Sequence, residues 1–323
     1  MMTAAVLVEP GRLDLATVPA PDCAPGEVLV RLAGVGLCGT DLAVFHGRRA
    51  VPATPWVLGH EGVGEIVATG SGVVDRTVGQ RVVIDPDICC FRCAPCRRGL
   101  TSACVDRASV GLTRPGLLAE YAAVPAGFTF PVADHVALED LVCAEPLTVA
   151  RAALRRSGIR AGDSCLVLGA GPQGLFLTMA LVAAGVRPRV SEPDPDRLAL
   201  ALSLGAVDAA DSDEPVGHVF EASGVPAALA TGVRRVAPGG TIVVVGMNSE
   251  PLAVRTDDLV RRQLTVVGSM IFDHPADFAA TVDVLDRGLL RPGRVLRREF
   301  PLARTAEAFA AMPGAPGKCW IRC

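Results

Sequence analysis

The stretch Cys165-Leu-Val-Leu-Gly-Ala-Gly-Pro-Gln-Gly174 decides the fold of this chain. An apolar run, Cys165–Leu168, leads into the pattern G-x-G-x-x-G, and a second apolar run, Leu175–Ala184, has the length of a helix. A strand before the glycines and a helix after them form the context in which this pattern binds a dinucleotide. The alternative is a glycine turn that serves packing alone.

Each glycine has a separate task in such a turn. Gly169 would permit the tight turn, Gly171 would let a pyrophosphate approach the backbone, and Gly174 would let helix and strand pack closely. Free N–H groups at the start of the helix would face the phosphates. The next expected strand, Arg189–Ser191, ends beside Glu192, eighteen residues beyond Gly174. An acid at about this distance hydrogen-bonds the adenosine ribose, so we expect Glu192 to do so.

The charges that follow Glu192 favour NAD over NADP. Asp194 and Asp196 stand close by, and like charges repel strongly in a partly desolvated pocket, so a 2′-phosphate would be disfavoured there. Arg197 is the counter-argument, because an arginine can hold that phosphate. Three acids against one arginine leave NAD as the expected cofactor.

Outward from this turn, strands alternate with helical segments, which predicts an α/β architecture with a doubly wound, parallel Rossmann sheet. Further strands are expected at Arg189–Ser191, His218–Ala222, Thr241–Val245 and Leu264–Met270. The last is an apolar strand at the sheet edge, and such edges invite pairing. We therefore expect a homodimer or homotetramer.

One connection in this half is unusually short. About eight residues separate the expected strands Val207–Ala209 and His218–Ala222, whereas a parallel crossover normally takes a dozen or more, usually as a helix. We expect that helix to be missing between Asp211 and Gly217.

The first hundred residues instead predict short β-elements separated by glycine and proline. The chain has 323 residues, 50% apolar and 20% charged, with a formal net charge of −3. This composition is globular and, without a basic run, argues against nucleic acid or an anionic membrane as a partner. We interpret the single lysine, Lys318, as a result of coding bias. The strands expected in the first hundred residues are Ala4–Val8, Leu13–Val18, Glu27–Ala33, Glu65–Ala68 and Arg81–Ile84.

An uncharged stretch, Ser164–Val186, is long enough to cross a bilayer. The G-A-G-P-Q-G sequence in its middle would break a membrane helix, so we expect a buried strand, turn and helix instead. The N-terminus carries no pattern of a secretory signal, and the cytoplasm is the expected compartment.

Four cysteines, Cys90-x2-Cys93-x2-Cys96-x7-Cys104, lie on one short segment. In a chain without export signals such a cluster indicates a metal rather than disulfides. Four thiolates form a closed tetrahedral zinc site with no open position for a substrate, so we expect this zinc to be structural. An iron–sulfur cluster is the alternative, but the related ferredoxin runs continue with C-x3-C-P, whereas seven residues separate Cys96 from Cys104.

Three further segments carry metal-ligand residue types: G-L-C-G-T-D around Cys38, G-H-E-G-V-G around His60 and A-E-P-L-T-V-A around Glu145. Spacing alone cannot join them. Together with the glycine turn and the four cysteines, they resemble the zinc-containing medium-chain alcohol dehydrogenases over essentially the whole chain. E-P-L-T-V is similar to the sorbitol and polyol branch. C-G-T-D-L-A-V-F-H-G and S-E-P-D-P-D-R-L resemble the aminocyclitol dehydrogenases of aminoglycoside antibiotic pathways.

This resemblance implies a Rossmann domain, residues 148–272, inserted into a GroES-like β-barrel catalytic domain. The catalytic domain would comprise residues 1–147, with the structural zinc lobe, and 273–323. A small alcohol or ketone would lie in the cleft between the domains, with Phe45, Trp56 and Phe272 as pocket walls or, equally, as core aromatics. The residues implied to contact the cofactor are Gly169, Gly171, Pro172, Gln173, Gly174, Glu192, Arg197, Gly246 and Met247.

The resemblance also implies a catalytic zinc, which makes two zinc ions per chain. Cys38 and His60 would bind it. Glu61 and Glu145 would be the third ligand or the residue that holds the zinc-bound water, and the sequence does not assign them. Zinc would act as a Lewis acid on the alcohol, and NAD would accept the hydride.

Thr40 would take the hydroxyl proton into a relay. Many relatives carry a histidine five residues beyond the cysteine ligand, where this chain has Ala43. His46 would substitute for it, or water would accept the proton from Thr40.

The sequence therefore predicts a zinc-dependent oxidoreductase that moves a hydride between a secondary alcohol of a polyol or (amino)cyclitol and NAD. A dehydrogenase of the same fold for threonine or a simple secondary alcohol is the nearest alternative. A non-catalytic protein that binds zinc and a dinucleotide is the alternative from another class. The second zinc site argues against it, because binding NAD alone needs no such site.

Overall fold

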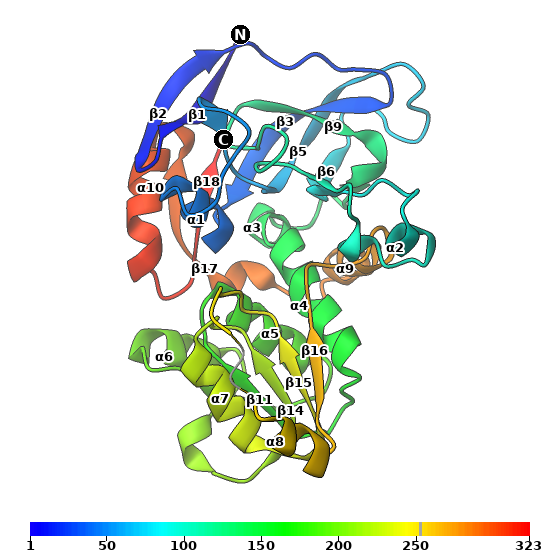
Figure 1. Cartoon of the computed structure of the whole chain (residues 1–323). Helices are drawn as coiled ribbons and strands as arrows, with labels where there is room; N and C mark the ends of the chain where they lie inside the picture. The colour runs from blue at the N-terminus through cyan, green and yellow to red at the C-terminus, as the bar shows by residue number, and fades with distance from the viewer. Residues whose placement is uncertain (252–253) are drawn as a thin grey trace. The chain divides into compact units, whose positions relative to one another are not determined.

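The computed structural model describes residues 1–251 and 254–323, and the chain forms two compact units. Unit 1 comprises Met1–Glu145 and Asp273–Cys323, and unit 2 comprises Pro146–Phe272. Unit 2 is therefore inserted into unit 1, and the colours of Figure 1 follow the chain through both.

Unit 2 is built on a six-stranded sheet with the order β13-β12-β11-β14-β15-β16, in which every pairing is parallel (Figure 1). All four residues of β11 are buried, as expected for a strand covered on both faces. This strand order is that of the doubly wound dinucleotide-binding fold, and it confirms the predicted α/β Rossmann sheet. The strands are β11 Cys165–Leu168, β12 Arg189–Ser191, β13 Val207–Asp208, β14 Val216–Glu221, β15 Val236–Val244 and β16 Thr265–Gly268.

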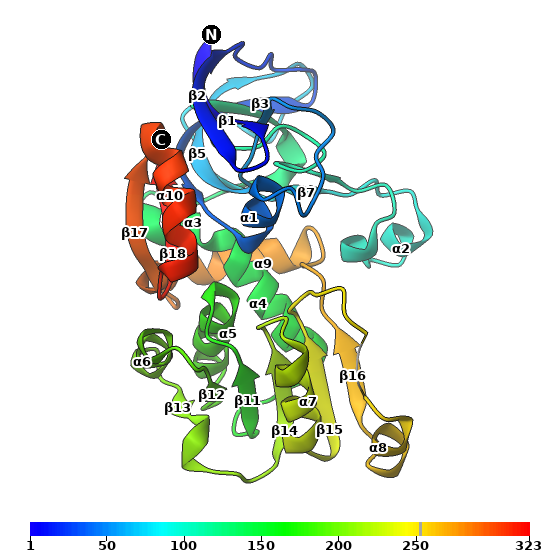
Figure 2. The ribbon, with the colours of Figure 1, turned by 60° about the vertical axis from the view of Figure 1, so that its left-hand side comes forward.

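Helices cover both faces of this sheet (Figure 2). α5 and α6 contact each other and the strands β11 to β13, whereas α7 packs on β11, β14 and β15. Right-handed crossovers that run in opposite directions from the centre place their helices on opposite faces. All three begin with proline in the first turn, where the missing N–H costs little. The helices of this part are α4 Ala144–Ser157, α5 Pro172–Ala183, α6 Pro195–Ser203, α7 Pro226–Arg235 and α8 Thr256–Arg261.

The short connection contains no regular helix, as predicted. β13 ends at Asp208, one 3₁₀ turn, η3 Ala209–Asp211, follows, and β14 begins at Val216. All of these residues lie in the described part of the chain. Figure 2 shows the connection passing the end of the sheet at which the strands begin, instead of crossing a face. Arg235 of α7 holds it, because its guanidinium donates to the Ser212 carbonyl at 2.5 Å.

Unit 1 is mainly antiparallel, and β3 Glu27–Gly36 lies at its centre. One edge of β3 pairs with β5 Glu61–Thr69 along its length. The other edge pairs first with β9 Tyr121–Pro125 and then, over its last three residues, with β18 Lys318–Arg322. This arrangement brings the end of β3 and the beginnings of β5 and β18 to one place.

The predicted strands of this half are present. β5 begins earlier than predicted, and the residues at its start include two glycines. These glycines weaken the sequence signal for a strand, but packing requires them. A Cβ at Gly62 would lie 2.4 Å from Leu117, and one at Gly64 would lie 2.2 Å from the Arg31 carbonyl oxygen. The other strands are β1 Met2–Glu9, β2 Arg12–Val18, β4 Trp56–Val57, β6 Arg81–Ile84, β7 Asp87–Ile88, β8 Ala108–Ser109, β10 Thr129–Pro131 and β17 Leu296–Pro301.

Short helices connect the strands of unit 1. They are α1 Gly39–Phe45, α2 Ala94–Arg97, α3 Leu138–Val142, α9 Ala276–Asp286 and α10 Thr305–Ala311, with 3₁₀ turns η1 Thr101–Ala103, η2 Ala126–Phe128, η4 Pro292–Val295, η5 Leu302–Arg304 and η6 Met312–Gly314.

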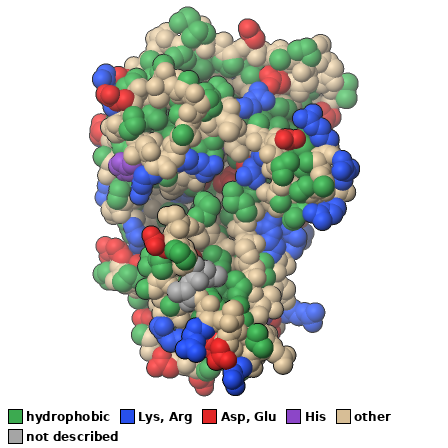
Figure 3. Space-filling model, viewed as in Figure 1, with side chains coloured by type: hydrophobic (Ala, Val, Ile, Leu, Met, Phe, Trp, Pro, Cys, Tyr) green, Lys and Arg blue, Asp and Glu red, His purple; other side chains and the backbone are tan. Residues whose placement is uncertain are grey.

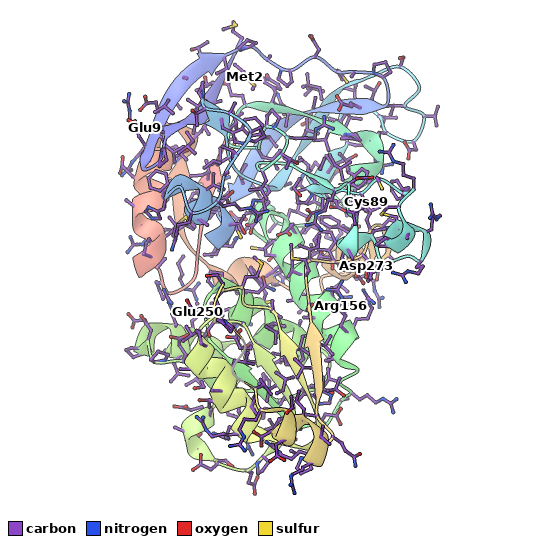
Figure 4. All side chains as sticks on the ribbon, viewed as in Figure 1. Met2, Glu9, Cys89, Arg156, Glu250 and Asp273 are labelled. Atoms are coloured by element: carbon purple, nitrogen blue, oxygen red, sulfur yellow. The ribbon has the colours of Figure 1, made fainter. Side chains whose placement is uncertain are left out.

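The chain returns to unit 1 at Asp273, which is labelled in Figure 4. The Asp273 carboxylate accepts a hydrogen bond from the Ser102 amide at 2.9 Å, and the His274 amide donates to Thr101 Oγ1 at 2.7 Å. Both partners belong to η1, within the four-cysteine segment. The imidazole of His274 lies 2.8 Å from the buried Asp85 carboxylate. The re-entry point is thus fixed to this segment.

None of the helices in the described residues combines the length and the apolar character of a membrane-spanning helix. The uncharged stretch Ser164–Val186 instead supplies β11 and α5, and residues 174–181 of α5 are buried within unit 2. On the face seen in Figure 3, acidic and basic side chains are interspersed with apolar ones.

Candidate active site and cofactor site

The glycine turn has the geometry that a pyrophosphate requires. Gly169 follows β11 with a φ of +93°, a conformation that favours glycine. A Cβ at Gly174 would lie 1.9 Å from the Gly169 carbonyl oxygen, so α5 can pack this closely on the glycine turn only because residue 174 has no side chain. A Cβ at Gly171 would meet nothing within 4 Å, which leaves space for a ligand. Gly171 caps α5 without a side-chain hydrogen bond, and Pro172 has no N–H, so the first amide donors of the helix begin at Gln173 and receive no acceptor from the cap side chain.

Glu192 lies directly after β12, at the same edge of the sheet as the glycine turn. Its Oε2 accepts a hydrogen bond from the Ala170 amide at 2.6 Å, and its Oε1 accepts one from the Asp194 amide at 3.0 Å. Glu192 thus fixes the glycine turn through backbone amides, a contact that the sequence does not predict. Asp194 caps α6 by accepting from the amides of Asp196 and Arg197, each at 3.0 Å. The ribose contact of Glu192 stays a prediction.

The four cysteines form one cluster. Ligand atoms of Cys90, Cys93, Cys96 and Cys104 all lie within 4.8 Å of one another. The Sγ atoms of Cys93 and Cys104 are 4.0 Å apart, close to the about 3.8 Å that tetrahedral zinc with Zn–S bonds of about 2.3 Å demands. Amide hydrogen bonds from Cys96 and Val105 lower the pKa of Cys93 to about 6, which favours the thiolate that zinc binds. This donor set fits a structural zinc ion.

A second cluster is formed by Cys38, His60 and Glu61, whose ligand atoms lie within 4.8 Å of one another. The sheet brings them together: Cys38 follows the end of β3, and His60 and Glu61 stand at the start of β5, with Gly36 in register with Glu61. Gly36 must be glycine here, because a Cβ would lie 2.1 Å from Glu61 Oε2. One thiol, one imidazole and one carboxylate are a donor set suited to zinc.

Asp41 orients the imidazole of His60 and was not singled out from the sequence. Asp41 is fully buried in α1. Its Oδ1 lies 3.1 Å from His60 Nδ1 and accepts a hydrogen bond from the Gly59 amide. Its Oδ2 accepts a hydrogen bond from the Cys38 amide. Burial acts to lower the pKa of His60, but the Asp41 carboxylate outweighs it and raises the pKa well above its ordinary value. With Nδ1 engaged, Nε2 is the nitrogen left for a metal. The G-T-D triplet after Cys38 was the available signal.

Lys318 is the second residue that sequence reasoning missed, because the scarcity of lysine was interpreted as coding bias and no chemical role was expected for this residue. It begins β18, is 2% exposed, and donates from Nζ to Glu61 Oε1 at 2.7 Å and to the Leu37 carbonyl at 2.8 Å. Nζ also lies 2.5 Å from Glu61 Oε2, so the ammonium group contacts both oxygens of the carboxylate. A carboxylate oxygen has two acceptor lone pairs, so Oε2 keeps one of them for a metal ion. Its being the single lysine was the available signal.

Glu145 lies near this cluster, in the first turn of α4, but does not belong to the set within 4.8 Å. It is buried, and burial, followed by the charge of Glu61, raises the pKa of Glu145 well above its ordinary value. A carboxyl group held neutral in this way can donate a hydrogen bond.

The two relay residues stand at opposite ends of α1. Thr40 is at its first turn, beside Cys38, and the exposed His46 follows its last residue. Six residues at about 1.5 Å rise separate their backbones by about 9 Å along the helix, so a direct transfer would need intervening water. The relay through His46 stays a prediction.

Of the three aromatic residues considered as pocket walls, Phe272 is buried. Phe45 packs on Phe309 with ring centroids 5.3 Å apart, and Trp56 donates from Nε1 to the Gly111 carbonyl at 3.1 Å. These contacts favour the alternative that they are core aromatics.

The fold and the two sets of metal-ligand residues together define a class of protein with a dinucleotide-binding unit and two candidate zinc sites, as expected for an oxidoreductase. The family model "Alcohol dehydrogenase GroES-like domain" matches residues 24–134, and "Zinc-binding dehydrogenase" matches residues 172–287. The chain belongs to the zinc-binding alcohol dehydrogenase family. It is accordingly a zinc-type alcohol oxidoreductase with a GroES-like domain and a Rossmann domain.

Individual relatives span the whole chain. D-altritol 5-dehydrogenase of Agrobacterium fabrum (strain C58) is 32% identical over 98% of this chain and 97% of its own. The NADH complex of RspB from Escherichia coli CFT073 superposes with a TM-score of 0.94 at 27% identity, covering 100% of this chain and 99% of the other. A zinc-binding dehydrogenase from Sinorhizobium meliloti 1021, bound to NADP, gives a TM-score of 0.92 at 28% identity, with coverage of 100% and 99%.

Proposed function

We propose that this chain is a zinc-dependent dehydrogenase that transfers a hydride between a secondary alcohol of a polyol or (amino)cyclitol and NAD. Unit 1 would be the catalytic domain and unit 2 the NAD-binding domain. The observation that carries the proposal is the cluster of Cys38, His60 and Glu61, whose ligand atoms lie within 4.8 Å of one another.

Cys38, His60 and Glu61 would hold the catalytic zinc, with Asp41 orienting His60 and Lys318 fixing Glu61. Bound there, zinc supplies Lewis-acid polarisation of the alcohol oxygen. As a thiolate, Cys38 would add one negative charge to those of Asp41 and Glu61. Lys318 and a divalent ion would supply three positive charges, which match the negative charges of Cys38, Asp41 and Glu61 when zinc is bound.

Glu61 is the better candidate for the third ligand because one of its carboxylate oxygens lies with the other two donor atoms. Glu145 would stay protonated beside it and donate a hydrogen bond to substrate or water. Thr40 would accept the proton of the alcohol hydroxyl and pass it to water, or through water to His46.

Two zinc ions per chain follow from the two donor sets. Elemental analysis of purified protein should give close to two zinc ions, and Cys38→Ala should reduce this to close to one without a large fall in Tm. Cys93→Ser should instead lower both the zinc content and Tm, because structural zinc contributes folding free energy. An unchanged zinc content in Cys38→Ala would place the catalytic metal elsewhere.

The substrate class rests on the E-P-L-T-V segment and on the relatives. D-altritol is a sugar alcohol, and other relatives are named as dehydrogenases of sorbitol, galactonate and arabitol phosphate. The aminocyclitol branch rests on sequence motifs alone.

A panel read as NADH formation tests the substrate: sugar alcohols, cyclitols, 2-deoxy-scyllo-inosamine, threonine and 2-butanol, with Cys38→Ala as the matched inactive control. The proposal expects kcat/KM to be highest for a polyol or cyclitol. Threonine or 2-butanol as the best substrate would favour the same-fold alternative. Activity on none of them, with two zinc ions bound, would favour the non-catalytic alternative.

We also propose a homodimer or homotetramer that pairs through β16. This strand is the sheet edge, and Val266 on it and Met270 after it expose 37% and 42% of their surfaces. A monomer by light scattering at micromolar concentration would contradict this.

A further inference from the structure

Glu221 ends β14, at the point of the sheet where the strand order reverses. It is paired with Leu168 of β11 on one side and with Val244 of β15 on the other. Its side chain is 2% exposed. A carboxylate at this depth must be held by donors, and the structure supplies them from the loop that follows β14.

The side chain of Glu221 fixes the loop after β14. Its Oε1 accepts three hydrogen bonds: from the Ser223 amide at 2.8 Å, from Ser223 Oγ at 2.5 Å and from the Gly224 amide at 2.9 Å. Hydrogen bonds to a charged acceptor are about twice as strong as neutral ones. Ser223 in turn packs against the glycine turn, where a Cβ at Gly169 would lie 2.9 Å from the Ser223 Cβ.

The backbone of Glu221 fixes the loop after β15. Its carbonyl accepts from the Val245 amide at 2.8 Å and from the Gly246 amide at 2.9 Å. Gly246 packs directly on the carboxylate, because a Cβ there would lie 2.6 Å from Glu221 Oε2. Asn248 then donates to the Gly224 carbonyl at 2.9 Å, and the loop continues to Glu250, which is labelled in Figure 4. Glu221 thus contacts both loops: its carboxylate accepts hydrogen bonds from the first and packs against Gly246 of the second, which its backbone carbonyl also holds.

These loops lie on the opposite side of β11 from Glu192. A dinucleotide crosses a doubly wound sheet at the carboxyl ends of its strands, with one nucleotide on each side of the point where the strand order reverses. With the adenosine ribose on the β12 side, the nicotinamide half must extend over the ends of β14 and β15. We propose that Glu221 is a positioning residue for the nicotinamide half of the cofactor, acting through the loops 222–225 and 245–248.

The test compares two ligands, NADH and AMP, on the full-length zinc-loaded chain by calorimetric titration. Glu221→Ala should raise the Kd of NADH about tenfold, as loss of several hydrogen bonds to a charged acceptor predicts, and leave the Kd of AMP within about twofold. Glu221→Gln, which keeps an acceptor oxygen, should recover part of the NADH affinity. Val219→Ala, which removes buried apolar volume from the same strand, is the matched control and should leave the ratio of the two Kd values unchanged.

An equal effect of Glu221→Ala on AMP and NADH would overturn the proposal, as would a Kd ratio no different from that of Val219→Ala. If Glu221→Ala does not fold, the ratio in Glu221→Gln decides, and an unchanged ratio there overturns it. The inference rests on the cofactor class alone. Failure of the unmodified chain to bind NADH would contradict the proposed function, whereas failure of the substrate panel would leave this test intact.

Discussion

Replacing Lys318 by methionine would remove one charge from the interior of unit 1 while keeping nearly the same length of side chain. Nζ donates to Glu61 Oε1 at 2.7 Å and to the Leu37 carbonyl at 2.8 Å, and both members of the pair are at most 2% exposed. The substitution leaves the Glu61 carboxylate buried without its counter-charge.

Breaking a buried pair by removing one partner costs about 3 to 5 kcal/mol, because the remaining charge stays out of water. We expect Lys318→Met to lower the free energy of unfolding by this amount in protein stripped of zinc. Zinc bound at Glu61 would supply a replacement positive charge, so the loss should be smaller in zinc-loaded protein. In Lys318→Met/Glu61→Gln neither charge remains, and the cost should fall well below the sum of the two single variants.

Urea unfolding with and without chelator measures these four proteins. Arg304→Ala, which breaks the exposed pair with Glu307, is the control and should cost less than about 1 kcal/mol. A loss in Lys318→Met as small as that of the control would refute the reasoning. Strict additivity of Lys318→Met and Glu61→Gln would refute it as well, since the two charges would then not be coupled.

Three further predictions test other parts of the molecule. Burial raises the pKa of Asp85 to about 6 in the folded chain from 3.8, so its contribution to stability is present below pH 3.8 and is lost as pH rises through 6. Between pH 4 and 7 the free energy of unfolding should therefore fall by about 3 kcal/mol less in Asp85→Asn than in the unmodified chain. The same fall in both proteins would contradict this. Gly171→Ala should weaken NADH binding and leave Tm nearly unchanged, because its Cβ would meet no protein atom within 4 Å. Gly174→Ala should weaken NADH binding and also lower Tm, because its Cβ would collide with the Gly169 carbonyl oxygen. Equal Tm values for the two variants would contradict this. Glu192→Ala should reduce the preference for NAD over NADP in kcat/KM, and an unchanged ratio would exclude Glu192 as its cause.

Much of unit 2 could be predicted because its signals are local. A strand, a glycine turn and a helix follow one another in Cys165–Ala184, and the structure gives a steric reason for Gly169 and for Gly174. The missing crossover helix was predictable for the same reason, since seven residues between β13 and β14 cannot form a face-crossing helix. The four-cysteine cluster is also local, on a single short loop.

The candidate catalytic cluster was predictable only in part. Cys38, His60 and Glu61 could be joined through resemblance to a family, but not by spacing, because they come from two strands that meet only in the folded sheet. The resemblance left Glu61 and Glu145 unassigned. The structure places the Glu61 carboxylate, and not that of Glu145, with the other two ligand atoms.

The sequence by itself determined which chemical groups are present and the local turns that hold them: the glycines, the four cysteines and the order of strands and helices. Only the tertiary structure decided which distant groups balance one another's charge. Lys318 reaches Glu61 from 257 residues away because β3 pairs with both β5 and β18. Glu221 likewise holds a loop that begins beyond the next strand. A buried charge must find its partner wherever the fold brings one, and neither periodicity nor spacing records that choice.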